Sequence, residues 1–114
     1  MLNRKEEKDP GGLADGSVIG FCLPQGYRDP AGVWHREGRL RPALVREEIR
    51  AQSDFRVYLR PESFLNIMLA QVVLRLGHLE KVDVGIVERL PAEDRALLQR
   101  LYREMNGYLP EELQ

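Results

Sequence analysis

Three side chains in this sequence have the chemistry for nucleophilic catalysis or metal binding: Cys22, His35 and His78. A thiolate nucleophile needs a base within hydrogen-bond reach and an electropositive setting. Cys22 lies in an apolar run, where a thiol behaves as a small hydrophobic group. The three residues also lack the spacings that are typical of zinc sites, such as CxxC, HxxxH or HExxH. The sequence therefore predicts no catalytic residue, no metal site and no cofactor.

Paired carboxylates offer a second route to acid–base chemistry. The sequence has three such pairs, at 47–48, 93–94 and 111–112. Adjacent residues on a helix point about 100° apart, so these pairs do not face one another across a substrate. A phosphate-binding loop is not indicated either, because Gly11-Gly12 precedes no predicted helix. We expect a binding domain and not an enzyme.

The charge is small overall but unevenly distributed. The chain has 114 residues and a net charge of −1. Residues 36–60 carry seven arginines and four acids, whereas residues 77–114 carry five basic and eight acidic side chains. Trp34 and Tyr58 lie near the arginines and would suit base stacking. The interleaved acids and the net charge argue against nucleic acid as a partner, so a small nucleic-acid-binding regulator stays a third alternative.

The length suits one domain. Residues 1–16 alternate charges of both signs and contain the breaker Asp9-Pro10-Gly11-Gly12, which predicts a disordered tail. We place a single domain at 17–107 and a loose C-terminal tail at 108–114. A single cysteine, no leader-type apolar run and no apolar stretch that would span a membrane favour a cytoplasmic protein.

Two strands are predicted at 18–23 and 33–40, from period-two alternation in the first and from the turn between them. Asp29-Pro30-Ala31-Gly32 fits a type I turn, because Pro presets the backbone angle and Asp caps the turn. The strands then form an antiparallel hairpin. Tyr27 and Trp34 lie near its tip, where they are either exposed binding anchors or packed on a helix.

Helical periodicity fills most of the remaining chain. Residues 42–51 predict a helix whose inner face holds Leu44, Val45 and Ile49, and 56–60 is expected to be an extended connector. Residues 61–76 give the strongest helix, ended by Gly77. Further helices are predicted at 84–90, capped by Asp83, and at 91–105. The fold class is therefore α+β, an N-terminal antiparallel β-hairpin packed against three to four α-helices.

Four short motifs occur in a set order. They are LPxGYxDxxGxxHREG at 23–38, RPxxFL at 60–65, RLG at 75–77 and DxxxLxxLYxxxN at 94–106. In this order and spacing the chain resembles the small phage tail assembly proteins, the tail assembly chaperone-like family of Mu-type phages and contractile injection systems. The resemblance covers about residues 17–106. It rests on order and spacing, because no motif is catalytic.

The resemblance implies a role during building of a contractile tail. Such proteins are thought to keep the helical, apolar tape-measure protein soluble while tail-tube subunits assemble around it. The tape-measure protein and the tail tube protein are therefore the implied partners, and a homo-oligomer is a further option. The alternative is a structural baseplate or tube-adaptor component of the same machine, whose hairpin adds to a partner sheet.

The walls of a partner-binding groove are expected on the two most apolar helices, unless the core consumes both. The apolar surface of 61–76 extends nearly all round the predicted helix, and 97–105 carries a second apolar stripe. Tyr27 and Trp34 are accessory anchors. The predicted partner-binding residues are Phe64, Met68, Val72, Leu98, Tyr102, Tyr27 and Trp34.

Overall fold

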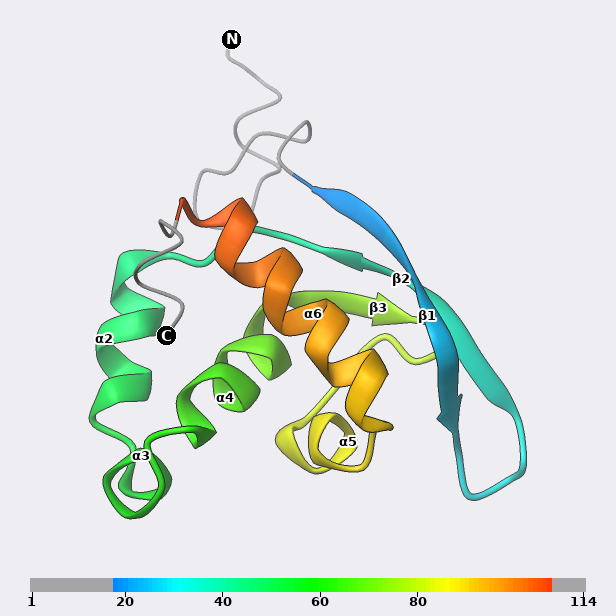
Figure 1. The fold of residues 1–114 in the computed structure, drawn as a ribbon, viewed down its shortest axis with the longest axis horizontal. Coiled ribbons are helices and arrows are strands. Elements are labelled where there is room, and N and C mark those ends of the chain that lie inside the picture. Colours follow the sequence, from blue (N-terminus) through cyan, green and yellow to red (C-terminus); the bar gives the residue numbers. More distant parts are fainter. Residues whose placement is uncertain (1–17, 108–114) are drawn as a thin grey trace, which may run out of the picture.

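Three antiparallel strands form a twisted sheet, and the helices pack against one of its faces (Figure 1). The computed structural model describes residues 18–107, so the predicted tails at 1–16 and 108–114 lie outside the described residues. The predicted α+β class and the N-terminal hairpin are confirmed. The described elements are β1 (Ile19–Arg28), β2 (Trp34–Leu40), α2 (Val45–Gln52), α3 (Phe55–Leu59), α4 (Ser63–Val72), β3 (Val73–Leu76), α5 (Val84–Glu88) and α6 (Ala92–Met105).

The hairpin turn forms as its residues predict. The Gly32 N–H donates to the Asp29 carbonyl over 2.8 Å, and Gly32 has a φ of +88°. The Asp29 carboxylate accepts the Val33 N–H at 2.9 Å and so caps the turn.

Along β1, Phe21 and Leu23 face the core while Cys22 faces outward. The alternation predicted for this strand is therefore correct, although Cys22 is exposed and not a buried hydrophobic group.

Strand β1 runs five residues beyond the predicted end at Leu23, past Pro24. Its pairing with β2 shifts register between Cys22 and Tyr27, so some backbone groups there lack a partner on β2. Asp94, in the first turn of α6, replaces that partner. Its carboxylate accepts the N–H groups of Gln25 at 2.9 Å and Gly26 at 2.6 Å. A fully buried carboxylate on α6 thus holds the irregular part of the sheet against the helix.

The helix predicted at 61–76 ends early, and this prediction is wrong at its C-terminal end. Helix α4 stops at Val72, and Val73–Leu76 becomes β3, which pairs with β2. Two consecutive β-branched residues, Val72 and Val73, favour the change from helix to strand. Pairing also satisfies backbone groups at the edge of β2. Gly77 has the positive φ that was predicted, +59°, but it ends the strand.

Residues 55–59 form helix α3 and not an extended connector. Asp54 caps this helix, since its carboxylate accepts the Arg56 N–H at 2.8 Å. An Asp is one of the preferred residues at a helix start. The cap predicted at Asp83 is confirmed, because Asp83 accepts the Ile86 N–H at 2.9 Å at the start of α5.

The core lies between the sheet and helices α4 and α6. Leu23 and Leu40 enter it from the sheet, Met68 and Val72 from α4, and Tyr102 from α6, and all five are fully buried. Within residues 18–107, no helix has the length and apolar character needed to cross a bilayer.

Candidate functional site

Four of the predicted partner-binding side chains are core residues. Met68, Val72 and Tyr102 have no exposed surface, and Leu98 is 2% exposed. Helices α4 and α6 pack directly on one another, so the space expected to be a groove between them is filled by their own side chains. The four residues predicted to form the walls of a groove are therefore part of the hydrophobic core. The phenolic O–H of Tyr102 donates to Glu48 on α2, which fixes this ring further.

The other three predicted residues differ in exposure. Phe64 is half-buried against the core, and Tyr27 is buried. The Tyr27 ring stacks near His35, with ring centroids 6.3 Å apart. Trp34 is 58% exposed, on the same hairpin. Of the two alternatives left open for the hairpin aromatics, Tyr27 is packed and Trp34 is exposed.

His35 is buried, and its two ring nitrogens are both occupied. Its Nε2 lies 2.9 Å from the Asp29 carboxylate, and its Nδ1 accepts the backbone N–H of His78 at 3.2 Å. This arrangement assigns the hydrogen to Nε2, which leaves no nitrogen for a substrate proton. The hydrogen bond with His35 also lowers the pKa of Asp29. The histidine therefore ties the turn at Gly77 to the hairpin.

Cys22 and His35 do not form a nucleophile–base pair. Cys22 lies opposite Glu37 in the sheet, and its thiol faces solvent. Its Sγ makes a weak hydrogen bond with the carbonyl of Leu23, at 4.0 Å. Among residues 18–107, no group of three His, Cys, Asp or Glu side chains is placed to hold a metal ion.

A surface on the two short helices has the character of a binding site. Five large apolar side chains are exposed there, which we call the α2–α3 patch: Val45, Ile49, Phe55, Tyr58 and Leu59. Their exposed fractions run from 61% for Ile49 to 81% for Tyr58. Single exposed apolar residues are ordinary, but a group of this size on adjoining elements indicates an interaction surface.

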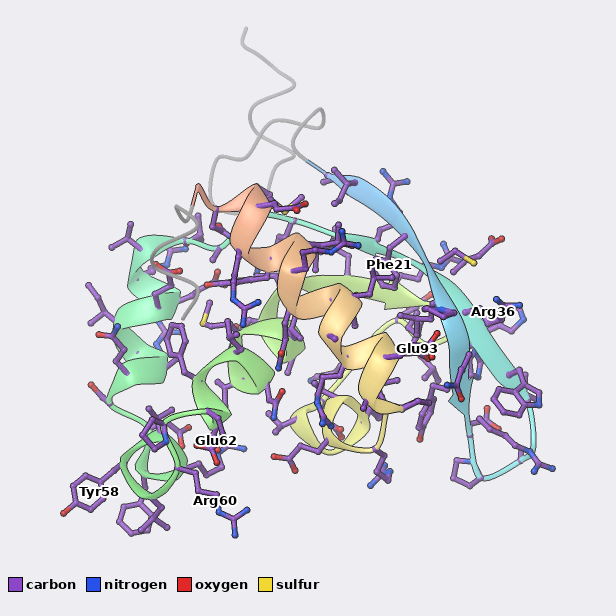
Figure 2. All side chains as sticks on the ribbon, in the orientation of Figure 1. Phe21, Arg36, Tyr58, Arg60, Glu62 and Glu93 are labelled. Atoms are coloured by element: carbon purple, nitrogen blue, oxygen red, sulfur yellow. The ribbon has the colours of Figure 1, made fainter. Side chains whose placement is uncertain are left out.

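Local structure explains how the patch is presented. Val45 and Ile49 lie one turn apart on α2, so they share a face. On α3, the rings of Phe55 and Tyr58 stack with centroids 6.0 Å apart. Tyr58 projects away from the body of the molecule at the α3 end, which Figure 2 shows at lower left. The patch is thus held on two capped helices and already has its aromatic rings ordered.

The opposite face of α2 explains why Val45 and Ile49 point outward. Arg41 is buried, and it donates to both carboxylate oxygens of Glu47 on α2, at 3.0 and 2.7 Å. Glu48 accepts from Tyr102 of α6. Since α2 directs these two carboxylates toward the body, the prediction that Val45 and Ile49 form its inner face is wrong. The hydrogen bonds from Arg41 also lower the pKa of Glu47.

A second candidate surface lies along β2. A shallow hollow of about 570 Å³ runs past Trp34 to Arg39 and Arg75, with Glu37 and His78 also in its lining. Arg39 and Arg75 are directly opposite one another on paired strands. The hollow is open and is lined by charges of both signs, so neither its shape nor its charge indicates a particular class of ligand. Its distinguishing feature is the exposed indole of Trp34.

Sequence reasoning missed the α2–α3 patch. The available signal was the spacing of Phe55, Tyr58 and Leu59, which is i, i+3, i+4 directly after a possible N-cap at Asp54. No family model, no curated protein and no solved structure matches this chain. The exposed surfaces and the order of the sequence motifs are therefore the features of this chain that bear on its function.

Proposed function

We propose that this chain is a non-enzymatic assembly chaperone of a phage-tail-like contractile machine. It acts in the cytoplasm and binds the tape-measure protein while the tail tube assembles. The motif order along the sequence supports the choice of machine. The α2–α3 patch is the observation that carries the binding role, because it exposes five large apolar side chains on adjoining helices.

The patch suits a tape-measure segment for a physical reason. A long helical protein exposes apolar stripes until the tube surrounds it, and such stripes aggregate unless another apolar surface covers them. Tyr58 and Phe55 provide large contact area at a low cost in side-chain entropy, as aromatic residues do at interface centres. The proposed contact surface therefore moves from α4 and α6, where the sequence placed it, to α2 and α3.

A structural baseplate or tube-adaptor component is the second candidate, and the exposure of Trp34 favours it. Trp34 begins β2, and the tip of the hairpin that β2 forms lies at the other end of the molecule from α3 (Figure 1). A protein with exposed aromatic side chains at both ends has the form expected of a bridge between two partners. An adaptor stays in the finished particle, whereas a chaperone leaves it.

Co-expression with the tape-measure protein of the same gene cluster tests both candidates. For a chaperone acting through the patch, this chain raises the soluble yield of the tape-measure protein, and Tyr58→Ser abolishes the increase. Trp34→Ser is the matched control, since it removes another exposed aromatic ring from the other end. Unchanged tape-measure solubility and no co-purification contradict the chaperone. Stoichiometric recovery of this chain in purified particles by mass spectrometry favours the adaptor.

A further inference from the structure

The carboxylates around the α2–α3 patch are already engaged by other groups. Glu47 is paired with Arg41, and Glu48 accepts from Tyr102. Asp54 is paired with Arg56 at 2.8 Å and caps α3. The hydrogen bonds from Arg56 lower the pKa of Asp54 to about 2, so this carboxylate stays ionised and paired. These acids therefore offer little attraction to a basic partner.

Several arginines at the same end form no ion pair with a described residue. Arg46, Arg50 and Arg60 are exposed, and none of them forms an ion pair with another described residue. Glu62, an exposed acid at this end without such a partner, lies close to Arg60 in Figure 2. Arg46 interacts electrostatically with Glu47, and the exposed Glu88 interacts in the same way with Arg56. Arg50 and Arg60 are therefore the cations of the rim that a partner can pair with. An apolar surface with a positive rim complements an apolar surface with a negative rim.

The shape of the patch selects a helical partner. Its side chains project from two helices, and the sheet edges that an extended peptide would pair with lie elsewhere in the fold (Figure 1). Val45 and Ile49 form one ridge, and Phe55 and Tyr58 form another. Ridges of this kind pack into the grooves between apolar side chains that repeat at i, i+3, i+4 and i+7 on a partner helix.

Charge also argues against a second copy of this chain as the occupant. Within residues 18–107 the other exposed aromatic group is Trp34, whose cross-strand neighbour is Arg28. Arg36 is exposed on the same strand. The Trp34 end also carries Glu37, so its charge is mixed. A dimer that joins two α2–α3 patches, in contrast, places the Arg50 and Arg60 side chains of both copies side by side, which is unfavourable.

We propose that the α2–α3 patch binds an acidic amphipathic α-helix. The apolar stripe of that helix covers Phe55, Tyr58 and Ile49, and its Asp or Glu side chains pair with Arg50 and Arg60. The inference rests on the proposed function only in taking this patch as the partner-binding surface. It adds the chemistry by which the partner is selected.

The test uses two designed helical peptides of about 18 residues, long enough for five turns. Both carry Leu at i, i+3, i+4 and i+7, one with Glu beside the Leu stripe and the other with Lys. Fluorescence anisotropy with the full chain measures each dissociation constant. We expect the Glu peptide to bind at least about tenfold more tightly, and this preference to shrink as salt rises from about 0.05 M to about 0.3 M.

Charge-reversed variants locate the contact. Arg50→Glu with Arg60→Glu weakens the Glu peptide at least about tenfold and strengthens the Lys peptide. Arg100→Glu, on the exposed side of α6, leaves both affinities unchanged. Urea unfolding of each variant separates lost binding from lost folding, and Tyr58→Ser weakens both peptides because it removes shared apolar area.

Several results overturn the inference. Equal affinity for the two peptides shows an apolar site without charge selection and leaves the proposed function standing. Binding to vesicles of anionic lipid but to neither peptide assigns the patch to a membrane surface. A dimer that Tyr58→Ser dissociates, detected by light scattering, assigns it to a second copy. A tenfold gain in peptide affinity on ending the chain at 107 assigns it to the acidic residues 108–114. Failure of the proposed function appears separately, as unchanged tape-measure solubility.

Discussion

Replacing Asp94 with Ala tests how the sheet is joined to the helices. Asp94 has no exposed surface, and its carboxylate accepts the N–H groups of Gln25 and Gly26 at 2.9 and 2.6 Å. No Lys or Arg pairs with it among the described residues, so these backbone groups are its main partners. The carboxylate also lies in the first turn of α6, where a negative charge is favourable.

The expected loss follows from these contacts. A hydrogen bond to a charged group contributes about 1.5–3 kcal/mol, and a buried N–H left without a partner costs about 1–3 kcal/mol. Gly26 is buried, whereas Gln25 is exposed and regains a water molecule as its partner. We therefore expect Asp94→Ala to lower the free energy of unfolding by about 3 kcal/mol. For a domain of this size, that lowers the melting temperature by about 12–20 °C.

Glu93→Ala is the matched control, measured with Asp94→Ala by urea unfolding under the same conditions. Glu93 is the neighbouring acid in the same helical turn, and it meets the Gln25 side chain at 3.2 Å on the surface. Its loss removes the same favourable charge from the helix start, but we expect it to cost less than about 0.5 kcal/mol. Faster amide exchange at Gly26 in Asp94→Ala alone locates the effect. If the two variants differ by less than about 0.5 kcal/mol, Asp94 does not anchor β1 and the reasoning is refuted.

Three further predictions concern the turn after β3 and the two ion pairs. Gly77→Ala is expected to lower the free energy of unfolding, measured in urea, by about 2 kcal/mol more than Gly107→Ala does. Both glycines have a positive φ, but of the two only Gly77 has a described residue, His35, in the space that a Cβ would occupy. Equal losses for the two variants contradict this prediction. Because Arg41 lowers the pKa of Glu47 below 4.5, the stability from that pair is present above the usual Glu pKa and is lost as pH falls through the lowered one. Glu47→Gln is expected to remove this part of the pH dependence of the free energy of unfolding, and an unchanged profile argues against the pair. In an NMR titration, we expect the pKa of Asp54 at about 2. In Arg56→Ala we expect this pKa to lie between 2 and the usual 3.8, because the backbone N–H at position 56 still donates to the carboxylate. A pKa that is unchanged in the variant shows that the Arg56 guanidinium does not cause the shift.

The parts of the fold that the sequence predicted depend on neighbouring residues. The Asp29–Gly32 turn, the Asp83 cap and the long last helix each form from residues within four positions of one another. Their signals are local backbone preferences and side-chain caps, which a single sequence displays directly. The inward face of β1 was also predicted correctly, because period-two alternation indicates which residues lie on the same side of a strand.

The parts that were missed depend on distant residues. Val73–Leu76 continues an apolar helical pattern, and it becomes a strand because β2 lies beside it. The extension of β1 beyond Pro24 depends on Asp94, about seventy positions away in the chain. A local pattern gives no sign of such partners, so tertiary pairing overrides the propensity of the segment.

Four residues predicted to bind a partner are core residues for a related reason. Sequence reasoning took the most apolar helices as the source of a binding surface, but the most apolar helix of a small domain is the one that its core needs most. Helices α4 and α6 use their apolar stripes on one another and on the sheet.

Helix α2 shows the opposite case, because its polar side chains decide its orientation. On its inner face, Glu47 forms an ion pair with Arg41 and Glu48 accepts a hydrogen bond from Tyr102. These contacts leave Val45 and Ile49 on the exposed side of the helix. Buried pairing of charged groups thus produces the exposed apolar ridge. The Arg41–Glu47 pair therefore orients the α2 side of the patch, and we expect binding of a partner to α2 to be sensitive to this contact on the other side of the helix.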